Sequence, residues 1–198
     1  MKKIMFNDKY GLTEAVLQGR KTMTRRFIKQ LLNDENPDIS DWGLKDGGKA
    51  MITLYEGGRP MTDIFPMYQP GEVVALAQRG IDIYHALQKR YGQTSDAALG
   101  FKEMYEGMPM WNNKMFVPAD LCPSRIQITN IKVERLQDIN GEDCLREGVL
   151  PYGITGVTAP NGVFSPREAF AALIDKVSGK GTWERNPWVF AYSFELVK

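Results

Sequence analysis

The sequence is poor in the residues that build disulfide frameworks and zinc sites. Its 198 residues include two cysteines, Cys122 and Cys144, and a single histidine. A structural zinc site needs more Cys and His ligands than these, so the chain cannot build one of the usual kind. Two cysteines in a chain of this length are typical of free, buried thiols in a reducing compartment, and we therefore expect a cytoplasmic protein.

Long apolar runs and an excess of one charge are also missing. No window approaches the run of about 18 apolar residues that spans a membrane, and the N-terminal stretch MKKIMFNDKY lacks the apolar core of a secretory signal. The 25 Lys and Arg residues are balanced by 24 Asp and Glu residues, which gives a formal net charge of +1. We expect no membrane association, and any nucleic-acid binding must come from a local basic patch.

The composition that is present is that of an ordinary globular domain. Apolar residues make up 43% of the chain and charged residues 25%, and the length suits one domain. Strand patterns occupy residues 3–7, 68–78 and 186–197, and a longer alternating one runs over residues 124–137. Residues 31–48 are rich in polar and turn-forming types, so we expect a loop or an insertion there.

Helix signals stand between the strand patterns. Asn140 and Ser165 are good N-cap residues, Pro166 occupies a first helical position, and Gly179 marks a C-terminal end. The strand patterns outnumber the helices that regular β–α–β crossovers would require. The sequence therefore predicts a mixed α+β fold around a small β-barrel rather than a doubly wound sheet.

The stretch LQGRKTMTRRF, residues 17–27, concentrates basic residues beside two threonines. Arg20, Lys21, Arg25 and Arg26 fall within seven positions. Residue types alone leave three interpretations open, namely a solvated charge run, a phosphate-binding loop and a catalytic loop.

The catalytic interpretation depends on Lys21 and Thr24. A lysine beside a threonine hydroxyl forms a simple nucleophile pair, in which the amine takes the proton and the oxygen attacks. The two residues are three positions apart, so they would diverge on a straight strand and could meet in a turn, which Gly19 favours. The amine must also be neutral, which requires burial or cations such as Arg25 to lower its pKa from about 10.4.

The segment GRKTMTRR, residues 19–26, resembles the Gly-x-Lys-Thr-x-Thr/Glu-x-Arg signature of the ASCH superfamily. Three later segments resemble parts of the same superfamily in the same order: PGEVVALAQ, RIQITNIKVERLQDINGEDCLREGV and NPWVFAYSFEL. The last is similar to the closing strand of large ASCH proteins from bacteria and prophages. The resemblance implies a single PUA-like domain over residues 1–198, an α+β fold with a small mixed β-barrel and flanking helices. Residues 28–67 and 79–118 are then insertions.

One branch of this superfamily comprises bacterial amidohydrolases that remove the acetyl group from N4-acetylcytidine. In these enzymes the lysine of the signature is the base and its second threonine is the nucleophile. A glutamate on the helix after the long strand donates the proton. The resemblance places these roles on Lys21, Thr24 and Glu147, and it implies no metal and no organic cofactor.

Beside the resemblance, the residue types themselves indicate how a nucleoside, nucleotide or RNA base would be held. Gly19, Arg20, Arg25 and Arg26 would line the pocket, with Arg26 also stabilising an oxyanion. Trp183, in a glycine-rich loop before the closing strand, would stack on the base. Because other ASCH proteins are expected to bind RNA, the alternative is a non-catalytic module for RNA or modified bases. The sequence does not determine the oligomeric state.

Overall fold

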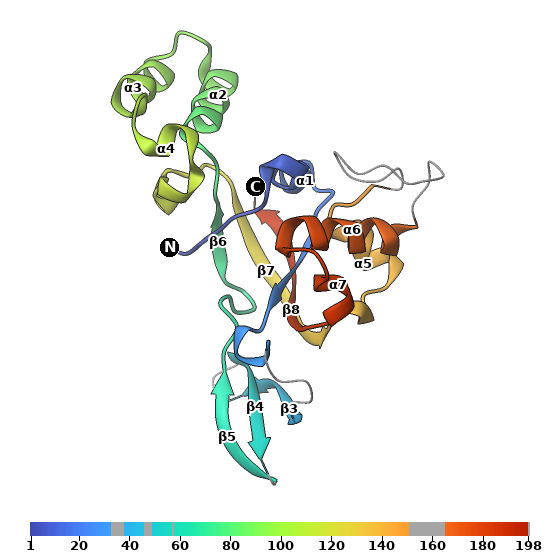
Figure 1. Cartoon of the computed structure of the whole chain (residues 1–198). Coiled ribbons are helices and arrows are strands. Elements are labelled where there is room, and N and C mark those ends of the chain that lie inside the picture. The colour runs from blue at the N-terminus through green and yellow to red at the C-terminus, as the bar shows by residue number, and fades with distance from the viewer. Residues whose placement is uncertain (33–37, 46–48, 57, 151–164, 198) are drawn as a thin grey trace.

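A central body carries a helical lobe at one end and a small β-sheet at the other (Figure 1). The structure, a computed structural model, describes residues 1–32, 38–45, 49–56, 58–150 and 165–197. The candidate site lies in the body, and the helical lobe and the small sheet project from it.

The body is built on a five-stranded mixed sheet with the order β1-β6-β7-β8-β2. Its strands are β1 (Lys3–Ile4), β2 (Met23–Phe27), β6 (Val73–Leu76), β7 (Arg125–Arg135) and β8 (Trp188–Val197). β1 runs parallel to β6, and the other neighbours are antiparallel. Among the described residues no pairing joins β1 to β2. The α+β prediction is therefore confirmed, while a closed barrel stays a prediction.

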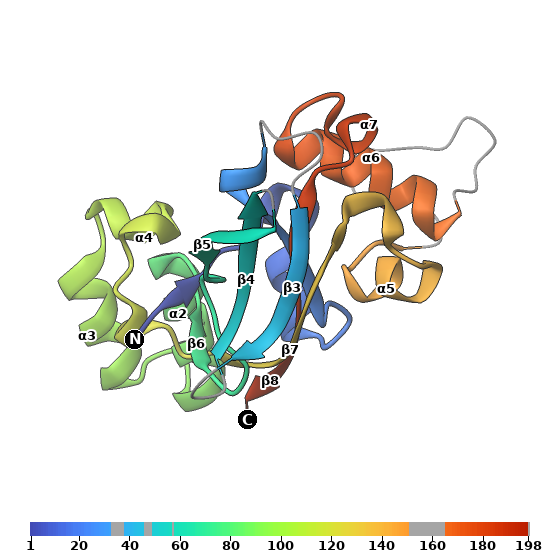
Figure 2. The same ribbon diagram turned by 90° about the horizontal axis from the view of Figure 1, so that it is seen from below.

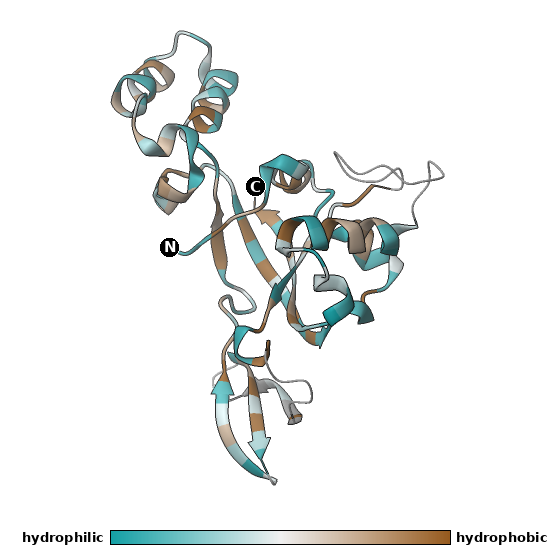
Figure 3. Ribbon diagram, viewed as in Figure 1, coloured by the Kyte–Doolittle hydropathy of each residue, from teal (hydrophilic) through white to brown (hydrophobic). Residues whose placement is uncertain are grey.

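The long alternating strand predicted over residues 124–137 is confirmed as β7. Ile126, Ile128 and Ile131 are buried in the main core, whereas Arg125 and Lys132 are exposed. Figure 3 shows this alternation of apolar and polar residues along β7 in the middle of the body. The buried face of the strand is what anchors the sheet.

The small sheet has the order β3-β4-β5, with β3 at Asp38–Lys45, β4 at Lys49–Glu56 and β5 at Arg59–Ile64. Residues 31–48 were predicted to be a loop or an insertion, and the loop alternative is wrong for the stretch 38–45, which pairs antiparallel with β4. The polar composition misled because the backbone hydrogen bonds of this strand come from a partner strand, which composition does not reveal.

Two groups of helices flank the sheet on opposite sides (Figure 2). One is the helical lobe, with α2 (Gly80–Tyr91), α3 (Asp96–Tyr105) and α4 (Pro109–Asn112), followed by the short η4 (Lys114–Phe116) and η5 (Ala119–Leu121). The lobe has its own small core, formed by Ile83, Met110, Val117 and Cys122 against Ala75 of β6. No helix in the described part of the chain is long and apolar enough to cross a membrane.

The other group contains α5 (Gly141–Arg146), α6 (Pro166–Ser178) and α7 (Thr182–Arg185), reached from β7 through η6 (Leu136–Asp138). The predicted caps are confirmed, because the Asn140 side chain accepts a hydrogen bond from the Asp143 N–H and the Ser165 side chain accepts one from the Glu168 N–H. Pro166 is the first residue of α6, as expected. These caps fix where α5 and α6 begin and hence which residues they turn toward the sheet.

Candidate active site

The basic segment runs from the end of α1 into β2. After η1 (Asp8–Tyr10), α1 covers Leu12–Leu17, and Gly19 then adopts φ +73°, a left-handed conformation that favours glycine. The backbone N–H groups of Arg20 and Lys21 both donate to the Ala15 carbonyl at 2.9 Å. This tight turn directs the Lys21 side chain into the protein just before the strand begins.

Lys21 is buried and its ammonium is fully hydrogen-bonded. Its Nζ donates to the Met23 carbonyl at 2.7 Å, to the Glu147 carbonyl at 2.7 Å and to Glu147 Oε2 at 2.6 Å. An ammonium has three N–H donors, so these acceptors satisfy all of them. With only 2% of the residue exposed, Lys21 is held rigidly against the end of α5.

Glu147 lies at the C-terminal end of α5 and connects two cations. Its Oε2 accepts from Lys21, and its Oε1 accepts from Arg25 Nη1 at 3.1 Å. The next residue, Gly148, has φ +93°, and a Cβ there would lie 3.2 Å from Lys21 Cβ. Glycine at this position therefore allows the carboxylate and the lysine to approach so closely.

Arg25 extends this pair into a network that crosses the sheet. It stands opposite Ala191 of β8, and this small residue stands in turn opposite Lys132 of β7. Arg25 reaches past Ala191 to Glu134 on β7, where its Nε and Nη2 donate to Oε1 at 2.9 and 2.6 Å. Its side chain is 1% exposed, so its charge is neutralised inside the protein rather than by solvent.

Asp143 closes the network from α5, one helical turn before Glu147. Its carboxylate lies 3.5 Å from Arg25, 3.2 Å from Arg146 and 3.8 Å from Lys132. The sequence interpretation missed Glu134 and Asp143. The i, i+4 spacing of Asp143 and Glu147 on a helix was the available signal for the second of them.

Burial sets the electrostatics of the site. The loss of solvation lowers the pKa of Lys21, the carboxylate of Glu147 opposes this, and the nearby Arg26 and Arg25 lower the pKa further. The net direction is downward, toward an amine that gives up its proton more readily than a solvent-exposed lysine. This is the direction that a lysine base requires.

Thr24 lies on β2 beside this network but faces the other way. It is buried, and it pairs with Tyr192 of β8, whereas its neighbour Arg25 points to the opposite face of the sheet. Among the described residues the Thr24 hydroxyl makes no hydrogen bond to Lys21 or Glu147. The structure thus brings Lys21, Glu147 and Arg25 together and leaves Thr24 one residue beyond the carbonyl that Lys21 binds.

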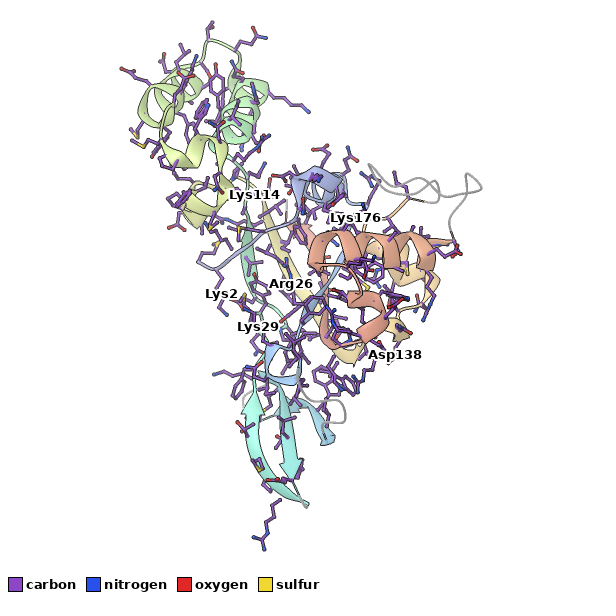
Figure 4. All side chains as sticks on the ribbon, in the orientation of Figure 1. Lys2, Arg26, Lys29, Lys114, Asp138 and Lys176 are labelled. Carbon is purple, nitrogen blue, oxygen red and sulfur yellow. The ribbon has the colours of Figure 1, made fainter. Side chains whose placement is uncertain are left out.

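Aromatic side chains form the wall on the Thr24 side. The Phe6 ring lies 5.2 Å from Lys21 Nζ and 5.7 Å from Arg26 Cζ. Tyr68 and Tyr192 pack edge to face at 5.5 Å. Arg26 itself is exposed in the middle of the body, and its Nη2 donates to the Met5 carbonyl at 2.7 Å (Figure 4). Phe6 and Arg26 therefore mark the boundary between the buried lysine and solvent.

The other predicted binding residues lie outside this cluster. Gly19 forms the turn, and Arg20 is exposed with its Nε donating to Gln18 Oε1 at 2.9 Å. Trp183 lies on α7, where it packs edge to face on Phe170 at 6.1 Å beneath the guanidinium of Arg167. In the described part of the chain, Trp183 makes no hydrogen bond or ring contact with Lys21, Thr24 or Glu147.

The cluster is closed to solvent in this structure. Lys21, Thr24 and Glu147 are 2%, 5% and 4% exposed, and two cavities found elsewhere in the described chain are lined by other residues. Within the described ranges, no three His, Cys, Asp or Glu side chains are grouped as metal ligands would be. Comparison with known proteins finds no match to the chain among models of protein families, curated proteins or solved structures.

Proposed function

We propose that the chain is a PUA-like, ASCH-type amidohydrolase that removes an acyl group from the exocyclic amine of a nucleoside or nucleotide base, as in N4-acetylcytidine. The observation that carries the proposal is the hydrogen bond of 2.6 Å from Lys21 Nζ to Glu147 Oε2 between two buried side chains. A direct hydrogen bond of this kind lets a proton move between the proposed base and the proposed acid.

Proton transfer along this hydrogen bond prepares both catalytic groups. Moving a proton from the Lys21 ammonium to Glu147 gives a neutral amine and a carboxylic acid, and burial of Lys21 favours the neutral amine. Because the Thr24 hydroxyl makes no hydrogen bond to Lys21 among the described residues, this mechanism requires the two side chains to come within hydrogen-bond reach when substrate binds. The amine then takes the Thr24 hydroxyl proton as Oγ1 attacks the acyl carbon. Glu147 gives its proton to the exocyclic nitrogen as the carbon–nitrogen bond breaks, which leaves an ester on Thr24.

Hydrolysis of the ester restores the neutral amine and the carboxylic acid, and return of the proton from Glu147 to Lys21 restores the ion pair. Water attacks the ester carbon and gives a proton to Glu147, and Thr24 leaves with the proton held by Lys21. The acyl group departs as a carboxylic acid, so atoms and charges balance. Arg26, exposed at the boundary of the site, would hold a phosphate or the oxyanion of the substrate. Because Phe6 lies over Lys21, productive binding requires this ring to move aside.

The test is hydrolysis of N4-acetylcytidine, followed by ultraviolet absorbance, for the wild type, Thr24→Val and Thr24→Ser. Valine has the shape of threonine and leaves the buried charges untouched, so it isolates the nucleophile. We expect Thr24→Val to lower turnover by about 100-fold or more and Thr24→Ser to retain part of it. Unchanged turnover in Thr24→Val would remove this mechanism, and a folded wild type without turnover would remove this substrate.

A second candidate function is binding of RNA without catalysis. It is favoured by Arg26 and Lys29, two exposed basic residues that have no ion pair among the described residues. Such side chains are suited to phosphate contacts, which predicts binding of single-stranded RNA that weakens steeply as salt rises. Filter binding at several salt concentrations measures this, and an affinity that does not depend on salt would contradict it.

A further inference from the structure

A cavity of 350 Å³ lies where the helical lobe meets the body, away from the Lys21 cluster. Figure 1 shows α1 near the lower end of α2, and the cavity lies between them. One wall comes from η1 and α1 and the other from α2 and the two residues that precede it. Its lining residues include Asp8, Thr13, Glu14, Gln78, Arg79, Asp82 and His85. The volume falls in the range of small-molecule sites.

Gln78 is one of the residues that line this cavity, and its amide oxygen is buried without a partner, so it would reach the cavity by rotation of the amide. The residue is 5% exposed, and its Oε1 is buried with no hydrogen-bond donor. Its Nε2 also makes no hydrogen bond to the described residues. Buried polar side chains in native proteins are almost always paired, so an unpaired one in the wall of a cavity indicates a missing donor.

The charges around the cavity leave one carboxylate without a cation. Asp8 is bound by Lys114 at 2.7 Å, and Asp82 is bound by Arg79 at 2.7 Å. Glu14 is exposed and has no cation within ion-pair distance among the described residues, and its Oε1 accepts only from the neutral amide of Gln18 at 2.8 Å. The remaining titratable group, His85, contacts Gln88 at 3.2 Å through Nδ1.

The missing complement to an unpaired carboxylate and an unpaired amide oxygen is a cation with several N–H donors. We propose that this cavity binds a small organic cation with a guanidinium or ammonium group, which pairs with Glu14 and donates a hydrogen bond to Gln78 Oε1. The terminal torsion of glutamine is soft, so the amide can turn its oxygen toward such a ligand. This site is independent of the proposed hydrolase activity, because none of its residues belongs to the Lys21 cluster.

The probe is agmatine, which carries both a guanidinium and an ammonium, titrated calorimetrically into the full chain. We expect saturable binding that Glu14→Gln weakens about tenfold or more, the loss expected for one charge-assisted hydrogen bond. Glutamine keeps the partner for Gln18, so the change removes only the charge. Glu184→Gln, at an exposed glutamate on α7, is the matched control and should leave the affinity unchanged.

Gln78→Met supplies a second readout that does not depend on the charge of Glu14. Methionine has a similar shape and no amide, so the free variant should melt at a higher temperature than the wild type, and the rise in melting temperature caused by agmatine should disappear. A lower melting temperature for the free variant would show that water already satisfies the amide and would remove Gln78 from the site. Absence of agmatine binding by the wild type, or binding undiminished in both variants, would overturn the proposal.

Discussion

Lys21 and Glu147 can both be charged inside the protein because each provides the opposite charge that replaces the lost solvation of the other. Removing one partner of a buried ion pair lowers the stability of a protein by about 3–5 kcal/mol, because the remaining charge is buried without solvent or counter-ion. Here the carboxylate has a second partner in Arg25, and Gly148 makes room for the lysine stem. Arg25 and Gly148 therefore fix the pair, and Arg25 also lowers the pKa of Lys21.

Tyr192, which pairs with Thr24 on the neighbouring strand, should make the stability of the protein depend on pH. Burial raises the pKa of Tyr192 to about 12 from 10.0. A tyrosine with a raised pKa in the folded state stabilises the protein fully below pH 10, and this contribution is lost as pH rises through 12. The loss amounts to about 2–3 kcal/mol. We expect Tyr192→Phe to show a smaller fall in stability over this window, measured by urea unfolding at each pH. Equal slopes for the two proteins would contradict this.

The helix ends show which elements can be predicted from sequence. The start of α6 was predicted because its signals, Ser165 and Pro166, are adjacent in the chain and act locally. The strand β3 was missed because its stability comes from pairing with β4, and polar residues on a strand at the edge of a sheet resemble a loop. The Lys21–Glu147 contact, which spans 126 residues, was reachable through family resemblance, whereas Glu134 required the register of β2, β8 and β7.

The cap of α6 is itself testable as an element. Ser165 Oγ accepts from the Glu168 N–H, and Glu168 Oε2 accepts from the N–H and the hydroxyl of Ser165, so the two form a capping box. We expect Ser165→Ala to lower the free energy of unfolding by about 1 kcal/mol. Ser95→Ala is the matched control on α3, where the cap hydrogen bond has a similar length, 3.4 Å against 3.3 Å at Ser165. No carboxylate completes a capping box there, because the third helical residue is Ala98, so the loss should be smaller. The reverse order in thermal denaturation would show that capping is not what fixes these helices.

At the scale of the whole molecule, the separate cores of the body and the helical lobe govern how stability is distributed. The core of the lobe is small and meets the sheet through Ala75 of β6, while β7 and β8 lie in the larger core. Regions with few buried apolar contacts open with lower free energies than the main core. The lobe should therefore open locally while the Lys21 cluster remains folded.

Met110→Ala tests this separation, because Met110 is 7% exposed and belongs to the core of the lobe. Replacing a buried methionine by alanine lowers the free energy of unfolding by about 2–5 kcal/mol when the surrounding residues cannot collapse into the cavity. We expect amide hydrogen exchange in α2, α3 and α4 to accelerate by about tenfold or more, since 1.4 kcal/mol corresponds to a factor of ten. Protection in β7 and β8 should not change. Faster exchange in all these elements together would mean that the lobe and the body unfold as one unit, and the lobe would then be an integral part of the site's scaffold.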